Sequence, residues 1–428
     1  MLLFAVLLLL ALFGMPLFAV IALGALIAFH QEGLNVTLVA MEFQRVGELP
    51  VLVALPLFTF AGVLLSHSKT PARLVDLSHA LFGWMPGGLA ILGLGMFALM
   101  TAFTGASGIT VVALGSLMLP ALLAAGYPER FSLGLVTAGS SMGVLFAPSL
   151  PLILYAVIAQ QVAPGQGIRI EELFLAGILP GLLLLSLLAG WAIYVRARTV
   201  PVNHVERQDR PGMAASLRNA VWELPLPFVV LGGIYSGFLL VIEAAVVTAA
   251  WVIVSLVLIR RDIEWKALPG IVAEAMVLVG AILVVLGVSM ASTNIMIDTQ
   301  VPQRLFETVE PWIANKWVFL LLINLLLLAV GMMLDIFAAL VIMAPLIIPI
   351  ALAFGVDPVH LGIIFLANLQ IGYCTPPVGI NLFLASHRFK RDILTIYRST
   401  LPFLGWLLVG LLIITWWPGL SLWLAGRG

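Results

Sequence analysis

Long apolar runs, separated by short polar breaks, cover almost the whole chain. About 20 apolar residues are needed for a helix to cross the hydrocarbon core of a bilayer. Membrane-spanning helices are therefore predicted at 2–29, 49–66, 172–196, 220–239, 240–259, 270–291 and 401–424. The first run has no basic residue before it and no cleavage pattern after it, so it is expected to be retained rather than removed as a signal peptide. A polar connection is predicted at 66–86 and an amphipathic segment at 292–316.

Four further apolar segments are too short to cross the bilayer alone, and they come in two pairs. The first pair, 88–103 and 108–124, flanks Thr104-Gly-Ala-Ser-Gly108. The second pair, 317–331 and 336–353, flanks Gly331-Met-Met-Leu-Asp335. Two short helices around a small polar tip predict a re-entrant hairpin, which enters and leaves the membrane on the same side.

Two longer apolar segments, 129–160 and 359–386, carry helix-breaking residues near their centres. The breakers are Gly143, Pro148, Ser149 and Pro151 in the first, and Gly372-Tyr-Cys-Thr-Pro-Pro-Val-Gly-Ile-Asn381 in the second. Proline removes a backbone donor and glycine gains little from a helix, so each segment is predicted to be a broken helix. Unwound backbone is tolerated in a membrane only where it is buried in protein or lines a polar cavity, and there it suits a small ion or an anionic group. A proline kink repaired by neighbouring helices is the alternative.

A shift of 229 residues superposes the two halves of this pattern without a gap. It aligns Pro120 with Pro349, Gly126 with Gly355, Gly143 with Gly372, and Pro148 with Pro377. It also lays hairpin on hairpin, broken helix on broken helix, and the span that begins at 172 on the span that begins at 401. The chain is therefore predicted to contain two structural repeats.

The basic residues predict which side of the membrane each loop faces, because cytoplasmic loops carry an excess of Lys and Arg. With a cytoplasmic N-terminus and both hairpins re-entrant, all but five of the 20 basic residues fall inside. Those five are Arg45, Arg169, Arg304, Lys316 and Arg427. The loop after the first broken helix is then external and the loop after the second is internal. The two repeats are therefore predicted to be inverted.

Composition narrows the class of protein further. Hydrophobic residues make up 62% of the chain, charged residues only 9%, and the mean hydropathy is +1.18. These values exclude a soluble globular domain and indicate an all-α polytopic membrane protein. The net charge is zero, which gives no reason to expect nucleic acid as a partner. The single cysteine, Cys374, excludes an intramolecular disulfide, and no constellation within the spans indicates an enzyme.

Inverted repeats of this kind place two hairpin tips and two helix breaks near the middle of the membrane, where secondary transporters bind substrate and coupling ions. Carbonyl and hydroxyl oxygens are the hard ligands that a sodium ion prefers. The predicted sodium ligands, through side chain or backbone, are Thr104, Gly105, Ser107, Gly143, Pro148, Gly331, Asp335, Gly372, Thr375 and Pro376. The predicted substrate-binding residues are Ser107, Thr110, Ser149 and Asn381.

Several of these side chains also have a structural interpretation. The alternative for the hydroxyls of Ser107 and Thr375 is a hydrogen bond back onto their own helices. Asp335 is a candidate helix cap, a candidate ion ligand, or both. Asn381 is expected either to donate to a substrate carboxylate or to brace the break. Two further acids near span boundaries, Glu243 and Glu274, are expected to have structural roles at the membrane interface.

Seven short motifs are spread along the chain. They are Ala54-Leu-Pro-Leu-Phe58 with Gly62, Gly87-Gly-Leu-Ala90, Ala125-Gly-Tyr-Pro128, Pro148-Ser-Leu-Pro151, Gly232-Gly-Ile-Tyr-Ser-Gly237, Gly331-Met-Met-Leu-Asp335 and Gln370-Ile-Gly-Tyr-Cys-Thr-Pro-Pro-Val-Gly-Ile-Asn381. Over nearly its whole length the chain resembles, through these motifs, the large membrane subunit of tripartite ATP-independent periplasmic (TRAP) transporters.

The resemblance implies an elevator-type, sodium-coupled importer of small organic acids in the bacterial inner membrane. It also implies two partners, a small four-helix membrane subunit and a soluble periplasmic substrate-binding protein. Sodium ions are expected between each hairpin tip and its broken helix. The implied division is a scaffold at 1–86, 161–316 and 387–428 and a transport domain at 87–160 and 317–386. A stand-alone carrier of the ion transporter superfamily, with the same inverted architecture, is the alternative.

The chain departs from the family pattern in three places. The serine-rich first tip is here Thr104-Gly-Ala-Ser107, which leaves backbone ligands available at the first ion site. The paired prolines of the first broken helix are replaced by Ala147-Pro148. A threonine-proline-threonine sequence before Glu243 is replaced by Leu240-Val-Ile242, which weakens any role carried over to Glu243.

Overall fold

Helices form the regular structure throughout the described part of the chain, as predicted for an all-α membrane protein. The computed structural model describes residues 6–427 apart from 8, 12, 83–86, 200–212 and 314. In that part, seven helices are long and apolar enough to cross a membrane, and two bent helix pairs raise the number to nine if each pair is one span. The chain is therefore a multi-pass membrane protein.

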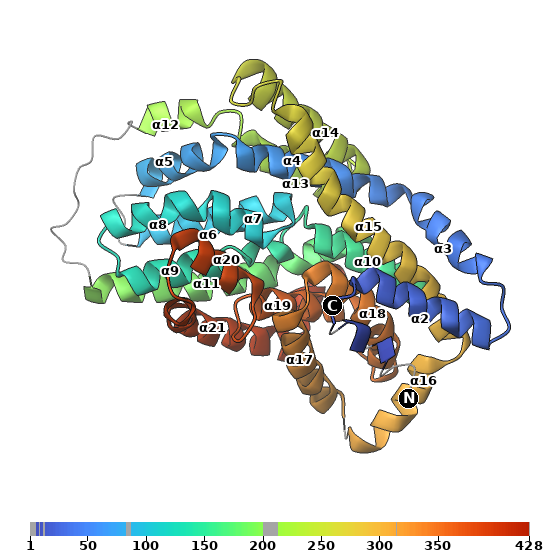
Figure 1. The fold of residues 1–428 in the computed structure, drawn as a ribbon. Coiled ribbons are helices and arrows are strands. Elements are labelled where there is room, and N and C mark those ends of the chain that lie inside the picture. The colour runs from blue at the N-terminus through green and yellow to red at the C-terminus, as the bar shows by residue number, and fades with distance from the viewer. Residues whose placement is uncertain are drawn as a thin grey trace.

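One group of helices is built around α15 (Leu268–Asp298), which has 31 residues. Figure 1 shows α2 (Leu17–Gln31) and α3 (Thr37–Gly47) running along it. The helix α4 (Ala54–His67), preceded by the turn η1 (Pro50–Val53), packs against both α15 and α14 (Val241–Ile253). The π-helical turn η4 (Val254–Ile259) continues α14, and α13 (Pro225–Tyr235) packs on α14. We call these helices the α15 group.

The other group contains the two predicted repeats. The first hairpin is formed by α6 (Gly88–Thr104), α7 (Ser107–Ala113) and α8 (Gly115–Ala124), and the first broken helix by α9 (Glu129–Gly139), η2 (Met142–Leu145) and α10 (Leu150–Val162). The second hairpin is formed by α17 (Lys316–Met333) and α18 (Ile336–Ala353), and the second broken helix by α19 (Pro358–Gly372) and α20 (Ile380–Phe389). Matching helix ends in the two hairpins lie 229 positions apart. The first arm ends at 104 and 333, the second arm begins at 107 and 336, and the second arm ends at 124 and 353. The repeat prediction is confirmed by these bounds.

Contacts at the two ends of this group show that the repeats are inverted. Arg391, after the second broken helix, pairs with Glu129 at the base of the first hairpin, with 2.6 Å between Nη2 and Oε1. At the other end, Arg427 lies 2.9 Å from Glu172, after the first broken helix, and 3.4 Å from Asp357 at the base of the second hairpin. The base of each hairpin therefore lies on the side where the other repeat's broken helix ends, so the hairpins enter from opposite sides.

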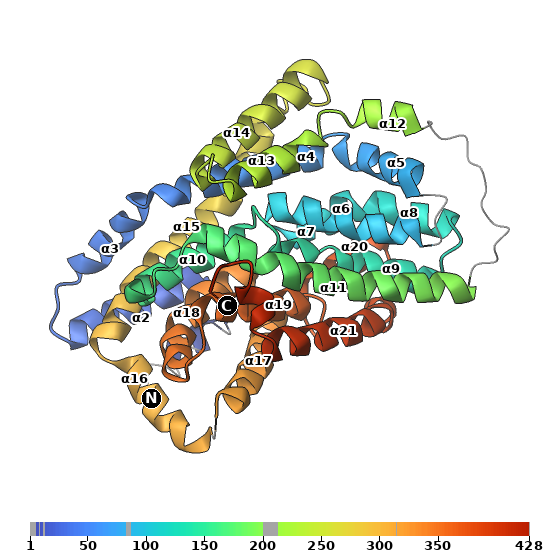
Figure 2. The ribbon, with the colours of Figure 1, turned by 180° about the vertical axis from the view of Figure 1, so that it is seen from behind.

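Two long helices that follow the broken helices complete this group. They are α11 (Ile170–Thr199) and α21 (Ile393–Trp416), which lie side by side in Figure 2 and pack against each other, with the short helix α22 (Gly419–Leu422) beyond α21. Both contact α19, and they also contact α6 and α9 respectively. The sequence assigned both helices to a scaffold with α4 and α15, whereas their packing places them with the hairpins and broken helices. We call the whole assembly the repeat group.

Several predicted boundaries are wrong, each for a local reason. The run 2–29 is not one helix, because Gly14 at φ +88° and Pro16 interrupt it before α2 begins; residues 1–5, 8 and 12 lie outside the described part. The span predicted at 220–239 is shortened to α13, which Pro225 begins and Gly237, at φ +72°, follows. The final span begins at Ile393 rather than 401, because Asp392 caps it by accepting from the Leu394 amide at 3.0 Å.

The polar segments also contain more helix than predicted. The segment 292–316 divides into the end of α15, then α16 (Val301–Val309) and the turn η5 (Glu310–Trp312). The connection 66–86 contains a helix, α5 (Thr70–Phe82), on which α12 (Met213–Asn219) packs. Arg73 of α5 forms ion pairs with both Glu223 and Asp262, and all three side chains are at most 12% exposed. These buried ion pairs hold α5 against the α15 group. Removing one partner of such a cluster typically lowers the stability of a protein by about 3–5 kcal/mol.

The inverted arrangement predicts that two loops of the repeat group are accessible from opposite sides of the membrane. Gln166 follows the first broken helix and Lys390 the second, and both are exposed. With Cys374 replaced by alanine, a cysteine at Gln166 should react with an impermeant thiol reagent added outside, and a cysteine at Lys390 only after the membrane is opened. Labelling of both cysteines from one side would contradict the arrangement.

Candidate functional site

Residues 373–379, between α19 and α20, form an unwound segment that we call the second break. Its backbone groups find partners outside a helical ladder. The amide of Gly379 donates to the carbonyl of Met332 on the second hairpin at 3.1 Å, and the carbonyl of Tyr373 accepts from the amide of Asn381 at 3.2 Å. Buried backbone groups in a membrane must be paired in this way, so the break is held open by the hairpin beside it.

Each broken helix touches its own hairpin at a point where there is no room for a side chain. A Cβ atom at Gly372 would lie 2.6 Å from the carbonyl carbon of Gly331. One at Gly143, the repeat equivalent, would lie 2.4 Å from the backbone nitrogen of Ala102. Gly331 and Ala102 are themselves 229 positions apart, so the contact is the same in both repeats. Gly331 lies in the last turn of α17. The second tip, predicted at 331–335, therefore comprises Leu334 and Asp335 alone.

Asp335 joins this short second tip to the second break. Its Oδ2 accepts from the Phe337 amide at 3.0 Å, which caps α18. Its Oδ1 accepts from the hydroxyl of Tyr373 at 2.9 Å, and the same hydroxyl accepts from the Ile336 amide. The predicted capping role of Asp335 is therefore observed, and the carboxylate is in addition exposed.

The first tip, Gly105 and Ala106 between α6 and α7, is also joined to the second break. Ser107 Oγ, at the start of α7, donates to Asn381 Oδ1 at 2.8 Å. Asn381 Nδ2 in turn lies 3.3 Å from Ser140 Oγ, at the end of α9, and 3.8 Å from Cys374 Sγ. The fully buried amide of Asn381 thus braces the first hairpin and both broken helices, which is one of its two predicted roles.

Three buried threonine hydroxyls gather beside the first tip. Thr101 Oγ1 lies 2.6 Å from the Ser140 carbonyl oxygen and 2.8 Å from Thr110 Oγ1. Thr104 Oγ1 lies 3.4 Å from Thr110 Oγ1 and 3.3 Å from the Ala106 carbonyl oxygen. Thr104 and Thr110 were predicted as site residues, whereas Thr101 and Ser140 were missed. The signal for Thr101 was its position three residues before Thr104, on the same helix face.

The other predicted residues have mixed surroundings. Thr375 Oγ1 donates back to the Ile371 carbonyl at 2.8 Å, which is its structural alternative. Pro148 and Pro376 lie within the two breaks, in the non-helical stretches that precede α10 and α20. Ser149 Oγ is buried and has no hydrogen-bond partner among the described residues, and the same holds for both amide atoms of Gln370, which the sequence did not single out. Unpartnered buried polar atoms are rare, and one explanation is an ion or water that completes them.

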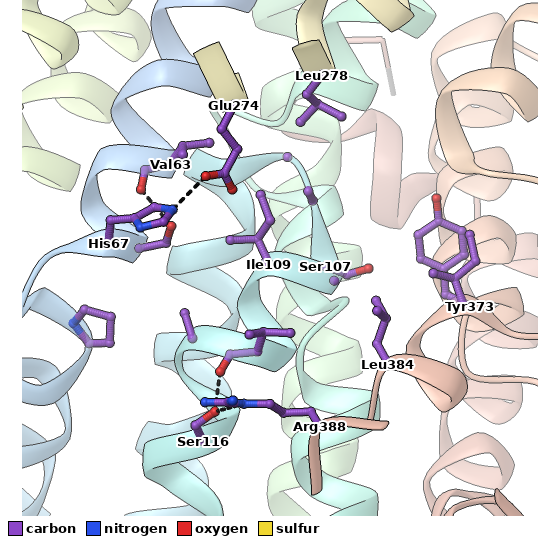
Figure 3. A pocket seen from close by; sticks show the side chains of 18 of the residues that line it. Val63, His67, Ser107, Ile109, Ser116, Glu274, Leu278, Tyr373, Leu384 and Arg388 are labelled. Carbon is purple, nitrogen blue, oxygen red and sulfur yellow. Dashed lines mark hydrogen bonds and ion pairs between the residues drawn. The ribbon is translucent and has the colours of Figure 1, made fainter. Parts of the chain in front are cut away.

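An open cavity of about 940 Å³ lies between the α15 group and the repeat group. Its walls come from the junction of α4 and α5, from α15, from the first tip with α7 and α8, from the second tip, and from α20. Figure 3 shows Ser107 and Tyr373 at one end of this space and Arg388 at another. Of the predicted substrate-binding residues, Ser107 lines the cavity, whereas Thr110, Ser149 and Asn381 do not.

Charged groups stand along the walls of this cavity. His67 of α4 and Glu274 of α15, which belong to two helices that pack together, pair on one wall of it, with 2.9 Å between Nε2 and Oε2. Arg388 of α20 donates from Nε to Ser116 Oγ on α8 at 2.7 Å. Arg388 and Ser116 lie toward the base of the first hairpin, which is the predicted cytoplasmic side, whereas His67 and Glu274 lie nearer its tip. Glu243 lies elsewhere and caps α14 by accepting from the Leu240 amide at 2.9 Å, the structural role expected of it.

Comparison with known proteins identifies the family. Residues 1–420 match the family described as "Tripartite ATP-independent periplasmic transporter, DctM component". The chain belongs to this family. It is 32% identical to the C4-dicarboxylate TRAP transporter large permease protein DctM of Rhodobacter capsulatus, over 99% of this chain and 98% of that one. It is 34% identical to the protein of the same name from Pseudomonas aeruginosa, over 91% and 89%.

Among solved structures, this DctM-family chain is similar to the YdaH transporter of Alcanivorax borkumensis. The TM-score is 0.63 at 17% identity, and the match covers 90% of this chain and 88% of that one. At that identity the likeness shows the fold alone. Family and fold together confirm the resemblance stated from the sequence motifs, and they confirm the prediction of a transporter rather than an enzyme.

The contact between Gly372 and Gly331 predicts a sharp effect of one added methyl group. Gly372→Ala puts a carbon atom 2.6 Å from backbone, which no rotamer change relieves, and overpacking typically costs about 1–3 kcal/mol. The purified variant should therefore melt at a lower temperature than the unaltered chain. Gly405→Ala in α21 is the control, because nothing lies within 4 Å of its added Cβ. Equal melting of the two variants would contradict the close contact.

Proposed function

We propose that this chain is the translocating subunit of a sodium-driven TRAP transporter, which carries a small organic anion into the cell. The observation that carries the proposal is the joining of both hairpin tips to the second break at the end of a cavity. Such a junction brings hydroxyls, carbonyls and a helix start together inside a membrane protein. Secondary transporters bind their substrates and coupling ions at junctions of this kind.

Sodium as the coupling ion is supported by the oxygen atoms at the first tip. The hydroxyls of Thr101, Thr104 and Thr110 lie close to two backbone carbonyls, and all three side chains are fully buried. Among the described residues, no three His, Cys, Asp or Glu side chains cluster as they do around a transition metal. Neutral oxygen ligands fit a hard monovalent cation. Threonine hydroxyls beside the first tip would therefore supply the oxygen ligands that the serine-rich tip supplies in the family pattern.

Substrate is proposed to bind where the cavity reaches the first tip. Ser107 Oγ and the backbone at Gly105 and Ala106 line this end of the cavity, opposite Tyr373. The start of α7 lies here, and a helix N-terminus favours a carboxylate. Because Asn381 is buried behind Ser107 and bonded to it, we assign Asn381 to positioning Ser107 rather than to direct contact with the substrate.

The location of the cavity supports an elevator mechanism. The cavity lies at the seam between the α15 group and the repeat group, and Arg388 in its wall lies toward the predicted cytoplasmic side. We propose that the repeat group, including α11 and α21, moves as a body against the α15 group. That motion would close this cavity and open its counterpart on the other side, as inverted repeats allow.

Two partners are proposed, in keeping with a three-part transporter family. One is a small membrane subunit, and the other is a periplasmic protein that delivers the organic anion. The chain would then act in the bacterial inner membrane with a cytoplasmic N-terminus. Co-purification of a small membrane protein with the tagged chain supports this reading, whereas uptake by the chain alone in liposomes would replace it with a stand-alone carrier.

The first functional prediction concerns the driving force. In liposomes that contain the chain, its small subunit and the binding protein loaded with an organic acid, an inward sodium gradient should drive uptake without ATP. Replacement of external sodium by choline should abolish it. Uptake that continues unchanged in choline would contradict sodium coupling.

A second prediction concerns the threonine hydroxyls. Thr101→Val and Thr110→Val each remove one buried oxygen, a loss of about 1–3 kcal/mol if nothing replaces it. The sodium concentration for half-maximal uptake should rise about tenfold, since 1.4 kcal/mol is a factor of ten in affinity. Thr248→Val in α14 is the matched control, because Thr248 is also fully buried and its hydroxyl bonds, among the described residues, to the Ala244 carbonyl alone. A control variant with the same sodium shift as the others would show that the effect is not local.

A further inference from the structure

The acids and the bases that line the cavity differ in how far they are engaged. Glu274 is paired with His67, and Asp335 accepts from the Phe337 amide and the Tyr373 hydroxyl. Neither Lys69 nor the terminal nitrogens of Arg388 has a hydrogen bond or an ion pair with any described residue. The groups left to interact with a molecule in the cavity are therefore predominantly cationic.

Arg388, on α20, is oriented by a serine of α8 that also lines the cavity. Its Nε donates to Ser116 Oγ at 2.7 Å, and the Ser116 hydroxyl donates its own proton to the Val112 carbonyl. Ser116 Oγ can then only accept, which fixes the guanidinium by one edge. The two terminal nitrogens remain, and two parallel N–H donors from a guanidinium match the two oxygens of a carboxylate.

Arg388 lies between the first tip and the predicted cytoplasmic opening. It is seven residues after Asn381 on α20, which places it about 10 Å further along the helix axis. The apolar side chain of Leu384, on the same helix, lines the cavity in between. An anion that leaves Ser107 therefore passes an apolar wall before it reaches a fixed positive charge.

The repeat shows that this charge belongs to one side only. The position equivalent to Arg388 in the first repeat is Ala159, which is fully buried, and the position equivalent to Ser116 is Pro345. No pair of an arginine and an orienting serine is thus available at the matching place on the opposite side. A residue that bound the substrate in both the inward-open and the outward-open states would be expected to have a counterpart in the other repeat, and Arg388 has none.

We propose that Arg388, oriented by Ser116, is a carboxylate-binding residue of the cavity that receives an organic anion on its way from the first tip to the cytoplasm. The proposal rests on the organic-anion transport proposed above. It adds to that transport proposal a specific site, at which Arg388 binds a carboxylate through two nitrogens near the cytoplasmic opening, distinct from the site at Ser107. The site acts on anions that leave the cavity or enter it from the cytoplasm.

One experiment tests the site without relying on transport. In the chain with Cys374→Ala, Val112→Cys places a thiol on the cavity wall, where Val112 is 39% exposed. Its reaction rates with an anionic sulfonate reagent and a cationic ammonium reagent are compared in the purified complex. Arg388→Gln should lower the anionic-to-cationic rate ratio about tenfold, because an unpaired positive charge near the thiol attracts anions and repels cations.

Matched variants separate a local site from a general charge effect. Arg398→Gln removes an exposed arginine of α21 that does not line the cavity, so it should leave the ratio unchanged. Arg388→Lys should keep most of the ratio but lose protection of the thiol by succinate, since an ammonium is a point charge without the fork. An equal ratio in Arg388→Gln and the unaltered chain, or an equal fall in Arg398→Gln, would overturn the proposal.

Transport then gives the functional consequence. In exchange across liposomes, Arg388→Gln should raise the internal succinate concentration for half-maximal exchange about tenfold and leave the external requirement unchanged. If no organic anion is carried by any variant, the proposed function fails, while the thiol rates still decide the anion site. If exchange is normal and both requirements stay unchanged in Arg388→Gln, the carboxylate site fails while the proposed function stands.

Discussion

The structure depends on satisfying an unwound stretch of backbone inside a membrane protein. Water is not available there to complete free amides and carbonyls, so an open helix must obtain its partners from neighbouring protein. The second break obtains one such partner, for the Gly379 amide, from the second hairpin, and side-chain hydrogen bonds join Tyr373 and the nearby Asn381 to the two hairpins. Gly379 bonds to Met332, Tyr373 to Asp335, and Asn381 to Ser107. The second break and the two tips are therefore one structural unit, although they come from three distant parts of the chain.

The two repeats share a backbone contact but differ in the side chains around it. Gly143 and Gly372 make the same close approach to their hairpins. Only the second repeat has an acid and a tyrosine that fasten the tip, since Ala106 and Val144 stand in the equivalent places. The first repeat instead gathers threonine hydroxyls beside its tip. The second repeat thus has side-chain bonds between its tip and its break, whereas the first has a buried cluster of neutral oxygen atoms.

Much of the architecture could be predicted from the sequence because breakers and apolar lengths are local signals. The 229-residue shift located both hairpins to within a few residues, and the charge distribution predicted their inversion. Cross-contacts could not be predicted in this way. Nothing local indicates that Asn381 bonds to Ser107, 274 positions away, rather than to its own repeat. The packing of α11 and α21 with the repeat group was missed for the same reason, since apolar spans look alike in sequence whichever neighbours they contact.

The central claim is that Ser107 and Asn381 act as one unit at the junction of the first tip and the second break. A double-mutant cycle on the substrate dependence of uptake tests it most directly, because residues that act through a shared bond are not additive. Ser107→Ala, Asn381→Ala and the double variant should raise the substrate concentration for half-maximal uptake by nearly the same factor. If the two single factors instead multiply in the double variant, the residues act independently and the account of the junction is wrong.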